Sequence, residues 1–553
     1  MKLGLLAGVA LITAVPFPAS AVPADFGARA EALIKDAYPA TGPGAAVIVV
    51  EDGKAVFTAG QGLADVETKR SITPDTVFRL GSITKQFSAA VMLQLVAEGK
   101  VSLDDRLSKF LPDYPEPGAN ATIAQLLNHT VGVQSYTGIP GFMDEAHTNK
   151  PYTTEQMIAL FKELPSPSKP GERWQYNNSG YVLVGAVIEK VTGKPWHVNV
   201  EERISRPLGL KSIRYGVMEA DTANMAKGYS RDGETVVPAK KIHMSVPHAA
   251  GALIGTVEDL ARWNEALNAG KVIPLELYAR MTAPTALPGG QTEEYGFGIA
   301  RRELKGRRAL GHGGGIFGFN TDSIYLPDED IFVAVFANSD SPAAEPGMVM
   351  MKLAALAVGD PFPSFQKTEL DPASYDAFYG VYAVEDGERR FFARDGKLFT
   401  QRSGGPPLEV YHAGEGKFFY PGSLSWFELS KDRTGAPQMA MHQQGASKAD
   451  ISLRTGPLPA EPRTVDLPRT TLGRYVGSYK AVMGIARVAL GESGPMTLQL
   501  GGQQPVPIRP ISETEFLAEG VDARIVFHLE GSAVKQLVIH QGGRELPAER
   551  LPD

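Results

Sequence analysis

The spacing of hydrophobic and polar positions changes once along the chain, and the change divides it in two. From Phe26 to Val358, segments with helical spacing are mixed with short apolar runs. From about Ala373 onward, helical signals disappear and short strands separated by glycine-containing turns take over. We therefore expect an α+β region followed by an all-β region.

Strands open and close the first region, and helices fill its middle. The spacing predicts helices at Phe26–Ala37, Phe87–Leu95, Thr122–Leu127, Val182–Val191, Leu260–Leu267 and Met348–Val358. It predicts strands at Ala45–Val50, Lys54–Gly60, Tyr295–Ala300, Arg308–His312, Asp322–Leu326 and Ile331–Ala337. The expected packing is one antiparallel sheet, built from both ends of the region and flanked by helices.

The second region contains an internal repeat. The segment Phe378–Tyr382 recurs as Tyr475–Tyr479, and the run that begins at His442 recurs at His540. Lys417-Phe418 likewise recurs as Glu515-Phe516, at nearly the same offset. A constant offset marks duplicated units. Each unit has room for about eight short strands, which suits a small closed barrel, lipocalin-like in outline. We interpret His442 and His540 as structural repeat positions.

Three domains follow, after a leader sequence. We place a signal peptide at residues 1–21, a first domain at 22–359 and two barrels at 370–455 and 470–553. Lys2, the apolar Leu3–Val15 and the small residues Ala19-Ser20-Ala21 have the order of a secretory signal cleaved after Ala21. The expected location is periplasmic or secreted. No later segment is apolar enough to be predicted as a transmembrane span.

Composition narrows the function classes. Apolar residues make up 43% and charged residues 21% of the chain, as in globular proteins. The net charge of -7 and the lack of a Lys/Arg run argue against a nucleic-acid partner. The chain has no cysteine, which excludes disulfides, thiolate metal sites and a cysteine nucleophile. We expect no metal and no cofactor.

The candidate chemistry centres on Ser82 and Lys85, at the start of a predicted helix. Residues three apart lie on the same helix face, so the Lys85 amine can reach the Ser82 hydroxyl. A serine needs a neighbouring base to become a nucleophile. The helix N-terminus also favours the negative charge that develops there. Taken alone, Ser-x-x-Lys also fits an ordinary helix start.

Two further segments extend this candidate site. Nearby Lys85 would favour the Tyr176 phenolate, which could accept the Ser82 proton and pass it to the leaving group. Asn178 could hold the substrate carbonyl and Lys85 through its amide. The alternative interpretation is a buried tyrosine and a helix-capping asparagine. His129 is either another candidate base or a turn histidine bonded to backbone, and we favour the turn.

The glycine-rich run after a predicted strand, His312-Gly313-Gly314-Gly315, is the third segment. Glycines there let a substrate lie along the strand edge, with Gly314 leaving room. The N–H groups of Gly315 and Ser82 could form an oxyanion hole. His312 is expected to select substrates, donating a hydrogen bond to Tyr176 or to a substrate carbonyl. A simple glycine-rich turn is the alternative.

Together the three segments resemble the motifs of the serine β-lactamase and penicillin-binding protein superfamily. Ser82-Ile83-Thr84-Lys85, Tyr176-Asn177-Asn178 and His312-Gly313-Gly314 have its order and rough spacing. The Tyr-x-Asn motif is similar to the class C branch. Class C enzymes have Lys-Thr-Gly where this chain has His312-Gly313-Gly314, and that lysine helps to bind a substrate carboxylate. The His-x-Gly motif followed by two barrels resembles the D-aminopeptidases.

The resemblance implies a serine hydrolase that cleaves amide bonds of small peptides, including those with D-residues, through an acyl-enzyme on Ser82. Other functions stay open: a carboxylesterase, a penicillin-binding D-Ala-D-Ala carboxypeptidase or β-lactamase, and an inactive peptide-binding protein. The expected partner is a small peptide or ester substrate. The sequence leaves the substrate's chirality and the oligomeric state open.

Overall fold

The computed structural model describes residues 22–217, 222–385, 387–460, 462–481, 484–491, 494–531 and 533–552. The chain forms two compact units, divided between Phe362 and Pro363. The expected signal peptide lies outside the described residues. Within them, no helix is long and apolar enough to cross a membrane.

An antiparallel sheet organises the first unit, in the order β12-β13-β15-β16-β1-β2, with β14 also paired to β15. The strands are β1 (Ala45–Glu51), β2 (Lys54–Gln61), β12 (Ala300–Leu304), β13 (Arg307–Gly311), β14 (Gly314–Ile316), β15 (Phe319–Leu326) and β16 (Ile331–Ala337). β1 pairs with β16 in a register that runs from Ala45–Ala337 to Glu51–Ile331. The predicted sheet built from both ends of the region is therefore confirmed.

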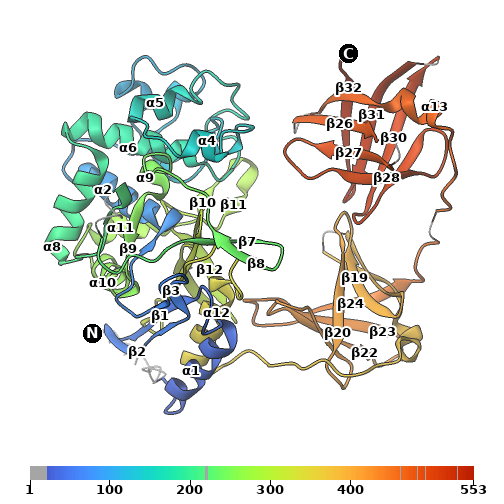
Figure 1. Cartoon of the computed structure of the whole chain (residues 1–553), viewed down its shortest axis with the longest axis horizontal. Coiled ribbons are helices and arrows are strands. Elements are labelled where there is room, and N and C mark those ends of the chain that lie inside the picture. Colours follow the sequence, from blue (N-terminus) through green and yellow to red (C-terminus); the bar gives the residue numbers. More distant parts are fainter. Residues whose placement is uncertain are drawn as a thin grey trace, which may run out of the picture. The chain divides into compact units, whose positions relative to one another are not determined.

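Helices cover both faces of this sheet. α12 (Pro346–Ala357) packs on β15 and β16 together with α1 (Phe26–Ala37), while α10 (Val257–Asn268) packs on β1 and β16. Figure 1 shows α10 and α12 on either side of the strands. Every residue of β16 is buried, as a strand covered on both faces requires.

A helical layer completes the unit, and α2 (Thr84–Ala97) runs through its centre. α2 packs against α6 (Asn178–Thr192) and α9 (His248–Gly251), which also contact each other. Eleven of the residues of α2 are buried, on all sides of the helix. A helix that is apolar all round belongs in a core. Its first turn therefore holds Lys85 inside the protein.

The other elements of this unit are short. The helices are η1 (Gly81–Ile83), η2 (Leu107–Lys109), η3 (Gly118–Asn120), α3 (Ile123–Leu127), η4 (Tyr136–Gly138), α4 (Glu145–Thr148), α5 (Thr154–Ala159), α7 (Trp196–Val200), η5 (Glu201–Ser205), α8 (Arg206–Leu208), α11 (Leu275–Met281) and η7 (Pro288–Gly290). The strands are β3 (Leu63–Asp65), β4 (Arg70–Ser71), β5 (Phe78–Arg79), β6 (Arg214–Tyr215), β7 (Tyr229–Asp232), β8 (Thr235–Pro238), β9 (Leu253–Gly255), β10 (Thr285–Ala286) and β11 (Thr292–Glu293).

Two sequence predictions need correction here. The segment Tyr295–Ala300 is not a strand, because β12 begins only at Ala300. Gly298 has a φ of +73°, and a Cβ there would lie 2.8 Å from the carbonyl oxygen of Lys85. The segment is thus a glycine-containing loop that lies against the start of α2. α6 begins at Asn178, one turn before the predicted start at Val182, because the Asn177 side chain caps it.

Two closed antiparallel barrels of eight strands each make up the second unit, as predicted. The first comprises β17 (Gly380–Val384), β18 (Gly387–Arg394), β19 (Lys397–Arg402), β20 (Pro407–His412), β21 (Lys417–Phe419), β22 (Trp426–Lys431), β23 (Pro437–His442) and β24 (Asp450–Gly456). The second comprises β25 (Gly477–Ala481), β26 (Gly484–Leu490), β27 (Met496–Leu500), β28 (Val506–Pro510), β29 (Glu515–Ala518), β30 (Ala523–Glu530), β31 (Ala533–Gln541) and β32 (Arg544–Arg550).

Helical structure does not end at Ala373, as the sequence suggested. The barrels are preceded by η8 (Pro372–Phe378) and by α13 (Arg469–Leu472) with η9 (Gly473–Tyr475). A proline at or just before the first helical position starts each turn with a fixed φ. Such short turns carry too little periodicity to be recognised in the sequence.

The sequence repeat corresponds to a repeated contact. The Tyr382 hydroxyl donates a hydrogen bond of 2.6 Å to the Phe378 carbonyl, and the Tyr479 hydroxyl donates one of 2.7 Å to the Tyr475 carbonyl. Both tyrosines are fully buried among aromatic and aliphatic side chains inside their barrels. The barrel interiors are therefore packed cores.

Candidate active site

Ser82 lies in η1, directly ahead of α2, and two glycines let β14 approach it. A Cβ on Gly314 would lie 2.0 Å from the Leu80 carbonyl oxygen. Gly81 has a φ of +52°, and a Cβ there would lie 3.0 Å from the Gly315 nitrogen. Both positions accept only glycine without a shift of the backbone. The strand edge and the serine are thus held side by side.

Lys85 reaches Ser82 as the helical spacing predicts. Its Nζ lies 3.0 Å from Ser82 Oγ, 2.9 Å from Asn178 Oδ1 and 2.9 Å from the Ala250 carbonyl oxygen. The side chain is fully buried, and none of these three partners is an anion. Burial therefore lowers the pKa of Lys85 well below its usual value. The neutral form of the amine has two protons for the Asn178 and Ala250 oxygens and a lone pair that can accept the Ser82 proton.

Tyr176 also meets Ser82, but not as a phenolate. Its hydroxyl is hydrogen-bonded to the Ser82 side chain, and burial raises the pKa of Tyr176 above its usual value. Lys85 Nζ lies 4.7 Å from the centre of the Tyr176 ring, over its face and not beside its oxygen. The expectation that a Lys85 cation holds Tyr176 ionised is therefore wrong. Burial thus shifts both pKa values toward the neutral forms, an amine and a phenol.

The two asparagines that follow Tyr176 have different roles. Asn177 caps α6: its Oδ1 accepts from the Gly180 N–H, and its Nδ2 donates to the Val133 carbonyl. Because Asn177 is the cap, Asn178 is free to face the serine. Asn178 Oδ1 accepts from Lys85, and its Nδ2 lies 3.3 Å from Thr137 Oγ1.

Gly315 presents its backbone to the same space. A Cβ there would meet nothing within 4 Å. The turn Phe317–Gly318 closes the β14–β15 hairpin at the Ile316–Phe319 pair, and Gly315–Asn320 is the next pair. Because antiparallel pairs alternate between hydrogen-bonded and open, the Gly315 N–H points away from β15. It thus faces Gly81 and Ser82.

His312 is placed differently from the sequence prediction. It is buried, its Nδ1 donates to the Gly313 carbonyl, and its Nε2 lies 2.7 Å from the Tyr295 hydroxyl. Since Nδ1 carries the proton, Nε2 accepts from Tyr295. Burial, and after it the nearby Lys85, lowers the pKa of His312 to about 3. Both nitrogens are used, so the expected bond to Tyr176 is absent.

His129 is the turn histidine that the sequence favoured. It has a φ of +67°, and its Nδ1 accepts from the Asn177 N–H at 3.1 Å. Its ring packs 4.3 Å from that of Tyr176 and 4.8 Å from that of Tyr295. Burial lowers the pKa of His129 well below its usual value. It supports the aromatic wall as a neutral ring.

A cavity of about 310 Å³ opens at Ser82. Its walls are Gly81, Ser82, Tyr136, Thr137, Met143, Asn178, Ile242, Pro247, Ala250, Gly251, Gly315, Ile316, Phe317, Phe319, Asn320 and Asp340. Only Asp340 among these residues carries a formal charge. The structure thus brings Ser82, Asn178 and Gly315 together at the cavity. Lys85 and Tyr176 contact Ser82, and Gly314 lies in β14 against the Leu80 carbonyl.

Sequence reasoning missed three residues of this site: Tyr295, Ala250 and Asp340. Tyr295 had a usable signal, because Gly296 and Gly298 interrupt its apparent strand, and glycine inside a strand pattern marks a bulge or a close approach. Ala250 acts through its carbonyl, and Asp340 follows β16 in an ordinary loop. Neither has a local signal.

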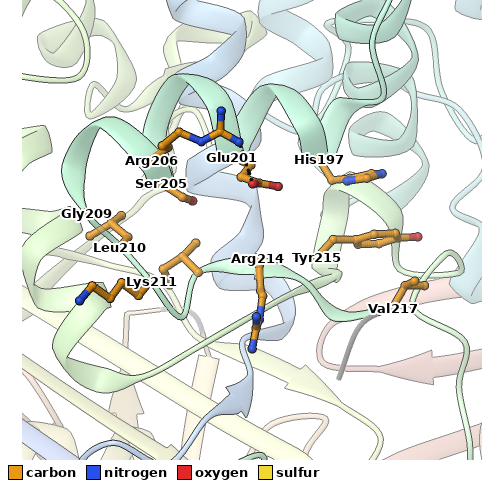
Figure 2. Close-up of a pocket in the computed structure, with 11 residues that line it drawn as sticks. His197, Glu201, Ser205, Arg206, Gly209, Leu210, Lys211, Arg214, Tyr215 and Val217 are labelled. Atoms are coloured by element: carbon orange, nitrogen blue, oxygen red, sulfur yellow. Dashed lines mark hydrogen bonds and ion pairs between the residues drawn. The ribbon is translucent and has the colours of Figure 1, made fainter. Parts of the chain in front are cut away.

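A larger cavity, of about 690 Å³, lies elsewhere in the first unit and contains none of the predicted site residues. It is bordered by α7, β6 and the π-helical turn η5. Figure 2 shows the His197 ring stacked on that of Tyr215, at 4.3 Å, and Arg206 paired with Glu201. Among the described residues that line this cavity, Ser205 and His197 share no hydrogen bond, so the cavity holds no nucleophile–base pair.

Comparisons with known proteins agree with this geometry. The family described as "Beta-lactamase" matches residues 34–355, more than half of the chain. The chain is 26% identical to a D-aminopeptidase of Brucella anthropi over 471 residues, 82% of this chain and 86% of that protein. It is 24% identical to penicillin-binding protein 4* of Bacillus subtilis, over 73% of this chain and 94% of that protein.

A solved structure is similar as well. The octameric penicillin-binding protein homologue from Pyrococcus abyssi superimposes with a TM-score of 0.56 and 26% identity, over 78% of this chain and 98% of that one. The protein described here is thus an enzyme, a serine hydrolase. It belongs to the beta-lactamase family.

Proposed function

We propose that this enzyme hydrolyses amide bonds of small peptides that contain D-residues, through an acyl-enzyme on Ser82. The observation that carries the proposal is the contact of Lys85 Nζ with Ser82 Oγ at 3.0 Å, at a buried amine whose three partners among the described residues include no anion. The similarity to a D-aminopeptidase over 82% of the chain supports the D-residue substrate.

In the first step Lys85 takes the hydroxyl proton of Ser82, and the Ser82 Oγ attacks the substrate carbonyl carbon. The lowered pKa of Lys85 favours the unprotonated amine, the form that can accept that proton. The negative charge moves to the carbonyl oxygen. There the N–H groups of Ser82 and Gly315 stabilise it, a contribution worth about 10²–10³ in rate for a single donor.

In the second step the C–N bond breaks, and the leaving nitrogen needs a proton. Tyr176 supplies it, because its phenol is neutral and hydrogen-bonded to Ser82. Lys85 then returns its proton to Tyr176. Water attacks the resulting ester in the reverse sense: the water proton passes to the same pair, and Ser82 leaves with a proton. The bonds and protons balance without a cofactor.

The environment of His312 argues against two of the alternatives. His312, which is buried and has a pKa of about 3, stands where class C enzymes have a lysine, and it provides no cation for a substrate carboxylate, which disfavours a D-Ala-D-Ala carboxypeptidase or β-lactamase. A carboxylesterase would use the same steps with an alcohol as the leaving group, and the substrate screen below separates it from an amidase. The barrels have packed interiors, so they offer no support for a carrier function.

The test is a substrate screen with matched leaving groups. The purified enzyme is given D- and L-alanyl p-nitroanilide, the corresponding p-nitrophenyl esters and nitrocefin, and Ser82→Ala is assayed beside it. We expect the D-anilide to be cleaved faster than the L-anilide, and the acyl adduct to map to Ser82 by mass spectrometry. Cleavage of esters alone, or undiminished turnover by Ser82→Ala, would contradict the proposal.

A further inference from the structure

The cavity at Ser82 carries one formal charge, and that charge is negative. Among the residues that line it, Asp340 is the only ionisable side chain with a charge at neutral pH. The remaining wall is apolar or neutral and includes Phe317, Phe319 and Ile242. A cationic substrate group that enters this cavity can therefore pair with one carboxylate, that of Asp340.

The position of Asp340 along the strand edge is fixed by its own contacts. Its Oδ2 accepts from the Gly318 N–H at 2.8 Å and from the Ser230 hydroxyl at 2.8 Å. Gly318 lies three residues after Gly315, whose N–H we assign to the oxyanion hole. Asp340 thus lies at the turn of the β14–β15 hairpin, next to the Ile316–Phe319 pair, and it borders the same cavity as Gly315 and Ser82.

Asp340 retains capacity for a ligand. Its Oδ1 accepts a long contact of 3.3 Å from Ser341 Oγ, and a carboxylate has about four acceptor sites. The side chain is half-buried, so an ion pair there is less screened than one in open solvent.

From this arrangement we infer that Asp340 determines specificity by binding a protonated amine on the acyl part of the substrate. The inference rests on the proposed function, since it names the substrate class of the same site. The amine is either the α-amine of a short aminoacyl or dipeptidyl group or a side-chain amine, since both present the same cation. In this scheme Asp340 selects the substrate, and the chemical steps belong to Ser82, Lys85 and Tyr176.

Paired esters test the inference independently of amide cleavage. D-alanyl and D-lactyl p-nitrophenyl esters differ only by an amine in place of a hydroxyl. N-acetyl-D-alanyl, D-alanyl-D-alanyl and N-acetyl-D-lysyl esters then separate the possible sources of the amine. For the wild-type enzyme we expect kcat/KM about ten- to hundredfold higher for the best amine-bearing ester than for its neutral partner, as for a hydrogen bond to a charged group. Equal values for all pairs would overturn the inference on their own.

The Asp340→Asn variant keeps a side-chain oxygen that can accept from the Gly318 N–H and loses the charge. We expect it to raise KM for amine-bearing esters and to leave kcat and the neutral esters unchanged. Asp328→Asn, on the exposed turn between β15 and β16, is the matched control. A uniform loss on every ester would assign Asp340 a structural role and refute the inference.

A pH profile gives a second readout. Wild-type kcat/KM for the alanyl ester is expected to fall as its α-amine deprotonates, near pH 7.7–8.0 for an ordinary α-amine. The wild-type enzyme should lack this decline with the lactyl ester. Asp340→Asn should lack it with both the alanyl and the lactyl ester. If anilides resist cleavage while these ester results hold, the proposed peptidase function fails and the role of Asp340 stands.

Discussion

Mild acid is expected to destabilise the first unit, because two of its buried histidines stay neutral. Burial lowers the pKa of His312 and of His248 to about 3, with the nearby Lys85 and His197 as the next causes. In the unfolded chain both titrate near 6.5. The unfolded state therefore binds protons that the folded state does not. The stability is fully present above pH 6.5 and is lost as the pH falls toward 3.

The size of the effect follows from the same values. Each histidine lowers the free energy of unfolding by about 1.4 kcal/mol between pH 7.5 and pH 5.5, and the pair lowers it by about 2.7 kcal/mol. Solvent screening is weak, because His248 is 3% and His312 is 6% exposed. Typical domains have only about 5–15 kcal/mol of stability.

His248→Asn tests this number. Asparagine tolerates the φ of +47° at this position and can bond the Thr154 hydroxyl, now 3.0 Å from His248 Nε2. The assay is guanidinium unfolding at pH 7.5 and 5.5, followed by tryptophan fluorescence in a Trp426→Phe background, which leaves tryptophans only in the first unit. Between pH 7.5 and 5.5, we expect the free energy of unfolding to fall by about 1.4 kcal/mol less in the variant than in the wild type.

Comparing the change in unfolding free energy between pH 7.5 and 5.5 cancels any destabilisation by the substitution that does not depend on pH. His528→Asn, in the second barrel, is the matched control and should leave the pH dependence of the first unit unchanged. A His248→Asn protein with the same pH dependence as the wild type, or a wild type with none in this range, would refute the reasoning.

Three further predictions concern the site and the domain division. Tyr176→Phe should lower kcat for anilides by about 10²–10⁴ with an unchanged melting temperature; a loss below about tenfold would leave the proton transfers to Lys85 alone. Gly314→Ala should abolish fluorophosphonate labelling of Ser82, because its Cβ would meet the Leu80 carbonyl at 2.0 Å, whereas Gly315→Ala has open space and should retain labelling. A fragment of residues 22–362 should unfold cooperatively and remain labelled; an unfolded fragment by circular dichroism would show that the barrels are needed.

The sequence was sufficient for the parts of the site that depend on local spacing. Ser82 and Lys85 meet because three residues on a helix span one turn, and the glycines of the third motif allow the close approach of β14. The sheet was also predictable, since apolar runs such as Ile331–Ala337 are too short for buried helices and are bounded by turn residues.

The charge states could not be predicted, because they depend on burial. A lysine beside a tyrosine suggests a cation and a phenolate. Burial in the fold instead lowers the pKa of Lys85 and raises the pKa of Tyr176. The pairing of His312 with Tyr295 was hidden for a related reason. It depends on a loop whose glycines let it pack against the Lys85 backbone, a contact between segments more than two hundred residues apart.

The pairing of β1 with β16 imposes an order on biosynthesis. Ala45 cannot pair with Ala337 until about 290 further residues have been synthesised, and until then that edge of β1 has no backbone partner. At roughly 5–20 residues per second the ribosome needs about 15–60 s to deliver the partner. During that interval the emerging hairpin exposes an apolar strand edge, the kind that recruits other chains. A message cut short before codon 331 would leave this edge open permanently, so premature termination should yield aggregates and not a smaller working enzyme.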